Sequence, residues 1–160
     1  MSELLNEKVE VFTDGATVGH NGKLGTVKEV GIGVYAKGEM KSKRNAVKIK
    51  ARMKQEIFYS EKMAGKSNNE AEFKALITGL DLCLDSFSLS DTIVFNMDSQ
   101  IVVNRMNGRR PKGKYLNTRM DFFQDEALKM AEKFENISFQ WIPREENTIA
   151  DGLSKEAVNL

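Results

Sequence analysis

The stretch Val9-Glu10-Val11-Phe12-Thr13-Asp14-Gly15 alternates apolar and polar side chains up to Thr13, which predicts a β-strand that ends at Asp14-Gly15. A second stretch, Thr92-Ile93-Val94-Phe95-Asn96-Met97, is largely apolar and runs directly into Asp98, which predicts a buried strand. In α/β folds, functional sites lie outside the carboxyl ends of such strands. The two aspartates are therefore the first candidate site residues.

The rest of the chain alternates between helix and strand patterns. Apolar residues recur at intervals of three and four and form one stripe of a predicted helix: Met120, Phe123, Ala127, Met130 and Phe134. We expect further strands at 31–36, 47–53, 56–63 and 137–141, and helices at 69–85, 101–106, 120–134 and from 148 onward. An initial run of strands followed by alternating helices and strands predicts an α/β fold with a mixed sheet flanked by helices.

Length and composition narrow the class of protein. The 160 residues fit one domain, and 41% apolar residues are enough for a core. No stretch approaches the roughly 20 apolar residues that span a bilayer, and the N-terminus lacks the pattern of a secretory signal. The single cysteine, Cys83, excludes an internal disulfide and a cysteine-based zinc site. We therefore expect a cytoplasmic protein with no membrane association.

The charge is nearly balanced overall, at +1, but is unevenly distributed. Residues 37–54 hold eight Lys or Arg and one acid, Glu39, and residues 105–119 hold six Lys or Arg and no acid. Such segments can contact a polyanion. They are equally compatible with ordinary solvated lysines.

Four acids stand where a site could form. Asp14 and Asp98 follow predicted strands, and Glu72 and Asp151 lie early in predicted helices. Carboxylates that converge repel one another, and a divalent cation such as Mg²⁺ removes that repulsion. With 23 acids in the chain, each could also be a simple turn or cap residue. Spacing alone leaves a metal-dependent phosphate hydrolase as one possibility among several.

Four short motifs, taken in order, resemble those of the type 1 ribonuclease H family. They are Phe12-Thr13-Asp14-Gly15-Ala16, Ser67-Asn68-Asn69-Glu70-Ala71-Glu72-Phe73-Lys74-Ala75-Leu76, Asn96-Met97-Asp98-Ser99-Gln100, and residues 143–151. The resemblance implies a ribonuclease H-like fold over the whole chain, 1–160, with a core at about 9–155. Its mixed sheet would have five strands, the first three antiparallel and the others parallel, flanked by helices.

The resemblance also implies the activity. It is that of a monomeric endonuclease that hydrolyses the RNA strand of RNA–DNA hybrids and leaves 5′-phosphate and 3′-hydroxyl ends. Two Mg²⁺ ions, with Mn²⁺ as an alternative, would be held by four catalytic carboxylates: Asp14, Glu72, Asp98 and Asp151. In the helix motif the catalytic acid would be Glu72 and not Glu70.

Substrate contacts follow from the same motifs. Asn68, Asn69 and Gln100 match positions that contact the hybrid in its minor groove, where amides can both donate and accept hydrogen bonds. Ser67 matches a hydroxyl near a DNA-strand phosphate, and His20 lies in the loop where the family often places another phosphate contact. Arg144 would contact phosphate. The alternative roles are helix capping for Asn69, strand-end solvation for Gln100, and simple solvation for Arg144 and His20. Either Asn69 or Ser67 can cap the helix that follows.

The chain departs from the family pattern in its last loop and in one linker, which leaves the rate and pH dependence of cleavage open. The loop before Asp151 has no histidine, and the linker 107–116 is too short for the basic protrusion of some bacterial members. A catalytically weak nucleic-acid-binding module of the same fold is the main rival function, and a DNA-cutting resolvase or integrase core is the other.

We further expect Cys83 in the core and Trp141 packed between sheet and helix.

Overall fold

A computed structural model describes residues 8–18, 28–41, 52–109 and 118–159. Its strands are β1 (Lys8–Val18), β2 (Lys28–Lys41), β3 (Arg52–Gly65), β4 (Thr92–Met97) and β5 (Asn136–Trp141). Its helices are α1 (Asn68–Ser86), α2 (Gln100–Met106), α3 (Thr118–Ala131) and α4 (Thr148–Ala157), with a 3₁₀ turn at Arg144–Glu146.

The five strands form one mixed sheet in the order β3-β2-β1-β4-β5. The pairs β1–β2 and β2–β3 are antiparallel, whereas β1–β4 and β4–β5 are parallel. The predicted fold class is therefore confirmed. Several predicted boundaries were wrong. The strand β1 does not end at Asp14 but runs on to Val18, held by continued pairing with β2. The strands predicted at 47–53 and 56–63 are not separate in the described residues, because β3 pairs with β2 without a break from Arg52 to Gly65. The helix predicted at 120–134 ends at Ala131.

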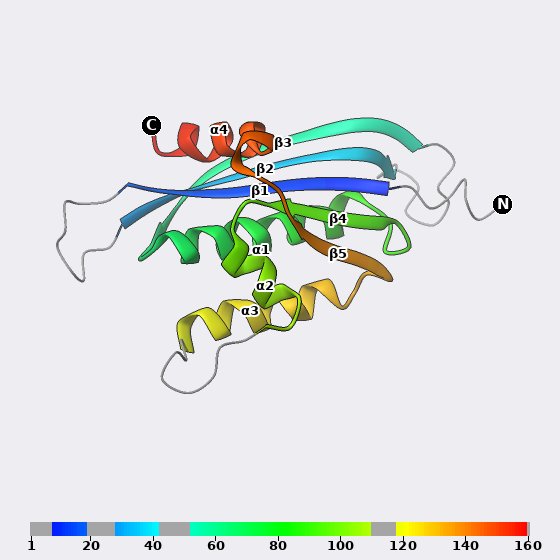
Figure 1. Cartoon of the computed structure of the whole chain (residues 1–160). Coiled ribbons are helices and arrows are strands. Elements are labelled where there is room, and N and C mark those ends of the chain that lie inside the picture. Colours follow the sequence, from blue (N-terminus) through cyan, green and yellow to red (C-terminus); the bar gives the residue numbers. More distant parts are fainter. Residues whose placement is uncertain (1–7, 19–27, 42–51, 110–117, 160) are drawn as a thin grey trace.

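Helices cover the two faces of the sheet unequally. The helices α1, α2 and α3 lie on one face and α4 lies on the other (Figure 1). The main core forms between α1 and the sheet, where Phe73, Leu76 and Leu80 are buried with Val11 and Phe95. Burial of each large side chain stabilises the fold by about 1.5–3 kcal/mol. Cys83 belongs to this core, as predicted.

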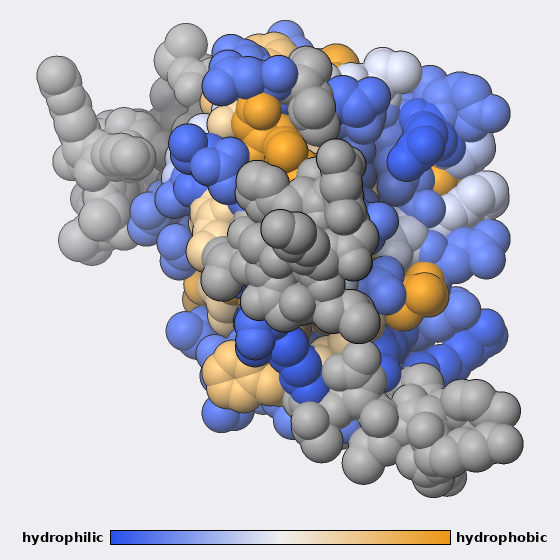
Figure 2. Space-filling model, turned by 90° about the vertical axis from the view of Figure 1, so that its left-hand side faces the viewer, coloured by the Kyte–Doolittle hydropathy of each residue, from blue (hydrophilic) through white to orange (hydrophobic). Residues whose placement is uncertain are grey.

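Figure 2 shows one face of the molecule, on which the coloured side chains are mostly hydrophilic and the hydrophobic ones lie in small patches. Among the described residues, no helix has the length and apolar character required to cross a membrane.

The small helix α4 approaches the sheet closely because two glycines of β2 lack side chains. A Cβ atom at Gly31 would lie 1.9 Å from the Ser154 carbonyl oxygen, and one at Gly33 would lie 2.1 Å from that of Ala150. The Ser60 hydroxyl of β3 also donates a 2.7 Å hydrogen bond to the carbonyl of Leu153. These contacts place Asp151, at the start of α4, beside the centre of the sheet.

We expect Gly33→Ala to destabilise the protein by about 1–3 kcal/mol or more, because its methyl group would meet backbone atoms that cannot rotate away. Denaturant unfolding would measure this loss. The matched control is Gly152→Ala on α4, where an added Cβ meets nothing within 4 Å. This control should gain up to about 1 kcal/mol through helix propensity. Equal stability of the two variants would contradict the close approach of α4.

Candidate active site

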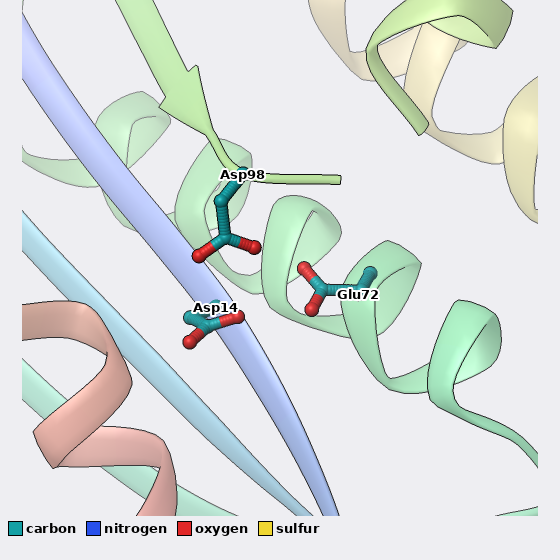
Figure 3. Close-up of side chains that lie close together, drawn as sticks. All are labelled: Asp14, Glu72 and Asp98. Atoms are coloured by element: carbon teal, nitrogen blue, oxygen red, sulfur yellow. The ribbon is translucent and has the colours of Figure 1, made fainter. Parts of the chain in front are cut away.

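Three carboxylates from three elements converge at the centre of the sheet. The parallel register pairs Thr13 of β1 with Met97 of β4, so the next residues, Asp14 and Asp98, lie side by side where β4 ends. Glu72 reaches the same point from the first turns of α1. One oxygen of each carboxylate lies within 4.8 Å of those of the other two, and the three groups point toward one another (Figure 3).

This cluster is charged and poorly solvated. Asp14 is only 4% exposed. Its pKa is raised to about 7, first by burial and then by the negative charges of Asp98 and Asp151, while a hydrogen bond with Glu72 acts in the opposite direction. Burial and the charge of Asp14 also raise the pKa of Glu72 well above its ordinary value. Without a cation, the cluster therefore retains protons that isolated carboxyls would have lost.

The fourth acid, Asp151, stands slightly apart. It does not belong to the group that lies within 4.8 Å, but its side chain hydrogen-bonds with that of Asp14. Burial raises the pKa of Asp151, yet the hydrogen bonds with Lys155 and Asp14 and the positive charge of Lys155 outweigh burial and lower it. The Lys155 ammonium lies 3.0 Å from the Asp151 carboxylate. Asp151 is thus anionic, and Lys155 is its ion-pair partner.

The chemistry of these donors fits a divalent cation. The Oε2 atom of Glu72 is buried and has no hydrogen-bond partner among the described residues. The nearest charged groups, Asp14 and Asp98, are also acids. Hard carboxylate oxygens are the ligands that Mg²⁺ and similar ions take. A cation would supply both the missing partner and the missing positive charge.

The neighbouring acid Glu70 has a different environment. It is 1% exposed, and its carboxylate forms ion pairs with Arg119 and, at 3.6 Å, with Lys74. It also accepts a 2.8 Å hydrogen bond from the backbone N–H of Lys66, and these partners lower its pKa against the effect of burial. Glu70 is therefore fully partnered and serves the start of α1, whereas Glu72 faces the cluster.

The predicted substrate contacts lie mainly at two helix starts. Ser67 caps α1 by accepting a hydrogen bond from the Glu70 N–H, so the capping role considered for Asn69 belongs to Ser67. Asn68 accepts a hydrogen bond from the Thr17 hydroxyl, and Asn69 is half-buried beside it. Gln100 is exposed at the first position of α2.

Two further predicted contacts fall elsewhere. Arg144 is exposed in the 3₁₀ turn before α4. His20 lies outside the described residues, as do the central parts of both basic segments. Of these two residues, only Arg144 can be located, on the turn that leads into α4 and Asp151.

Two residues near the cluster were missed or misplaced by sequence reasoning. Trp141 was predicted to pack between sheet and helix, which is wrong: it is 46% exposed. It is the last residue of β5, and its indole N–H donates a 3.1 Å hydrogen bond to the carbonyl of Asp98. Asn147 was not singled out, yet its amide contacts both Asp98 and β1. Its place within the fourth motif, residues 143–151, four residues before Asp151, was the available indication.

Comparisons with known proteins agree with this arrangement. The chain belongs to the reverse transcriptase-like family, whose model matches residues 41–157. Within that class it belongs to the type 1 ribonuclease H family. It is 30% identical to the solved LC11-RNase H1, isolated from compost by a metagenomic approach, over 95% of this chain and 96% of that one, with a TM-score of 0.64.

Other relatives extend the comparison. LC11-RNase H1 has also been solved in complex with an RNA/DNA hybrid, at 29% identity over 94% of this chain and 96% of that chain, with a TM-score of 0.63. RNase H1 from the archaeon Halobacterium salinarum, at 24% identity over 95% of this chain and 98% of that one, shares the fold with a TM-score of 0.68. The bifunctional protein Rv2228c of Mycobacterium tuberculosis is 39% identical over 94 residues, which are 58% of this chain but only 24% of that protein. The match thus spans about a quarter of the length of that relative.

Proposed function

We propose that this protein is an endonuclease that hydrolyses the RNA strand of RNA–DNA hybrids by two-metal-ion catalysis and leaves 5′-phosphate and 3′-hydroxyl ends. The observation that carries the proposal is the convergence of Asp14, Glu72 and Asp98 within 4.8 Å. The hybrid complex of the similar LC11-RNase H1 supports the choice of substrate.

The four acids would hold two Mg²⁺ ions, with Mn²⁺ as an alternative. Asp14 would contribute to both ions, since it interacts with Asp98, Glu72 and Asp151. Bound Mg²⁺ supplies an activated water and stabilises the leaving oxygen of a phosphodiester. Because Asp14 has a pKa of about 7 in the absence of metal, ion binding displaces its proton and is therefore favoured as pH rises. Lys155 keeps Asp151 ionised at the edge of the site.

The starts of α1 and α2 would recognise the hybrid. Asn68, Asn69 and Gln100 carry amides that can donate to and accept from a ribose 2′-hydroxyl, the group that distinguishes RNA from DNA. The Thr17 hydroxyl fixes the orientation of the Asn68 amide. Ser67, Arg144 and His20 would contact phosphates. We further propose that the protein works as a monomer in the cytoplasm, where the buried thiol of Cys83 stays reduced.

The test is a substrate panel: RNA–DNA hybrid, duplex DNA and duplex RNA, each labelled on both strands and incubated with Mg²⁺, Mn²⁺ or a chelator. We expect metal-dependent cleavage of the RNA strand of the hybrid alone, and end-group analysis should find 5′-phosphates. Tight binding of an intact hybrid would favour the catalytically weak module instead. Cleavage of duplex DNA would favour a resolvase-like activity.

A paired substitution distinguishes the two acids of α1. Glu72→Gln should lower the cleavage rate by about a hundredfold or more through loss of a metal ligand, and leave the unfolding midpoint unchanged or higher. Glu70→Gln should lower the free energy of unfolding by about 1–3 kcal/mol, because Arg119 and Lys74 lose a buried anionic partner, with a much smaller effect on rate. Initial rates and thermal melts of both variants measure this difference. The reverse pattern would show that Glu70 is the ligand.

A further inference from the structure

The side chain of Asn147 is buried between the elements that carry the acids. It is 1% exposed, and its Nδ2 amide donates a 3.0 Å hydrogen bond to the carbonyl oxygen of Thr13 on β1. The same nitrogen donates a 3.1 Å hydrogen bond to Oδ2 of Asp98. One side-chain amide therefore joins the residue before Asp14 to the carboxylate of Asp98.

The orientation of this amide is determined by its partners. Both contacts are acceptors only, since one is a carbonyl and the other is a carboxylate. A rotated amide would place an oxygen against two oxygens. Nδ2 carries two hydrogens, and each of them has one acceptor, so the donors of this group are fully used.

Asn147 occupies the N-cap position of α4, yet its side chain does not cap that helix. Instead, the backbone carbonyl of Asn147 accepts a 3.0 Å hydrogen bond from the N–H of Asp151, while the side chain reaches the sheet. The Oδ1 atom is buried and has no partner among the described residues. Because a buried, unpaired acceptor lowers stability, the arrangement is better explained by the acidic site than by helix stability.

We propose that Asn147 is a positioning residue of the active site. It holds Oδ2 of Asp98 and so restrains that carboxylate within the acidic cluster, and it fixes the start of α4, and hence Asp151, against β1. A neutral donor suits this place because it restrains the Asp98 carboxylate and leaves its negative charge in place. A lysine at this position would neutralise that charge. The catalytic part of this inference rests on the proposed function, whereas the contacts themselves do not.

Asn147→Ala and Asn147→Asp separate this role from helix capping. Aspartate has the size of asparagine and caps helices equally well, but it cannot donate a hydrogen bond to Asp98 and adds a charge beside it. We expect the thermal midpoint in chelator to fall in the order wild type, Asn147→Ala, Asn147→Asp. With hybrid and Mg²⁺, kcat should fall about tenfold in Asn147→Ala, and at least as much in Asn147→Asp, while KM for the hybrid stays within about twofold.

The matched control is Asn136→Asp, which makes the same charge change at the exposed first residue of β5, at the other end of the sheet. It should keep the midpoint and the rate of the wild type. If Asn147→Asp matches the wild type in midpoint and rate, the donated hydrogen bond to Asp98 positions nothing and the inference is wrong. If Asn147→Asp does not fold, Asn147→Ala decides: an unchanged kcat overturns the inference, and a tenfold lower kcat at constant KM supports it. An inactive wild type would remove the proposed function, but the order of midpoints would still test the contact with Asp98.

Discussion

Asp98→Asn should abolish cleavage of the RNA strand, with a loss of about a thousandfold or more, and leave the fold intact. The substitution keeps the shape of the side chain but replaces an anionic ligand with a neutral amide, which Mg²⁺ binds far more weakly. Asn147 can still donate to the oxygen of the new amide. Removal of one negative charge also relieves repulsion with Asp14 and Glu72, so the metal-free variant should be at least as stable as the wild type.

The measurements are the initial rate of cleavage of labelled hybrid and the thermal melt by circular dichroism. The matched control is Asp85→Asn, the same change at an exposed position near the end of α1, which should cleave and melt like the wild type. Retention of a near-normal rate by Asp98→Asn would remove Asp98 from the site. A large fall in its melting temperature would instead mean that the carboxylate is structural.

The second large effect is the pH dependence of the free energy of unfolding when no metal is bound. Asp14 has a pKa of about 7 in the folded protein against an ordinary value of 3.8. A raised folded-state pKa means that the folded state binds more protons than the unfolded state over this interval. The stabilising contribution is complete below about pH 4 and is lost as pH rises through about 7, a change on the order of a few kcal/mol. Glu72 acts in the same direction, whereas Asp151, with a lowered pKa, acts in the opposite one.

The free energy of unfolding in chelator should therefore fall as pH rises from about 4 to about 8, and Mg²⁺ should reduce the loss by binding the folded cluster. Asp14→Asn should flatten the curve and be more stable than the wild type at the upper end of this range. Asp85→Asn should retain the wild-type slope. A wild-type curve that is flat in chelator, or that rises with pH, would contradict the uncompensated acidic cluster.

The fold was largely predictable because its strands and helices differ in hydrophobic period. The stripe on α3 and the apolar run of β4 are both local patterns. The end of β1 was not predictable in this way. An Asp-Gly pair favours a turn, but nine residues of β2 pair with Glu10 to Val18 and hold the pair in an extended strand, and that partner is distant in sequence.

The site was predictable as a set of residues and not as a geometry. Asp14 and Asp98 become neighbours only through the parallel register of β1 and β4. The choice of Glu72 over Glu70 came from the motif, and its physical reason is the ion pair of Glu70 with Arg119, 49 residues away. Asn147 and Trp141 carry no local pattern that indicates a contact with Asp98, because both contacts depend on where β4 ends.

The most direct test of the central claim is the rate of RNA-strand cleavage as a function of Mg²⁺ concentration, for wild-type protein and a hybrid whose two strands carry different labels. The carboxylate cluster predicts no cleavage in chelator, a rate that rises with Mg²⁺ to saturation, and an intact DNA strand throughout. Cleavage of the RNA strand at an undiminished rate in chelator would contradict the account, because the acids would then not act through a metal.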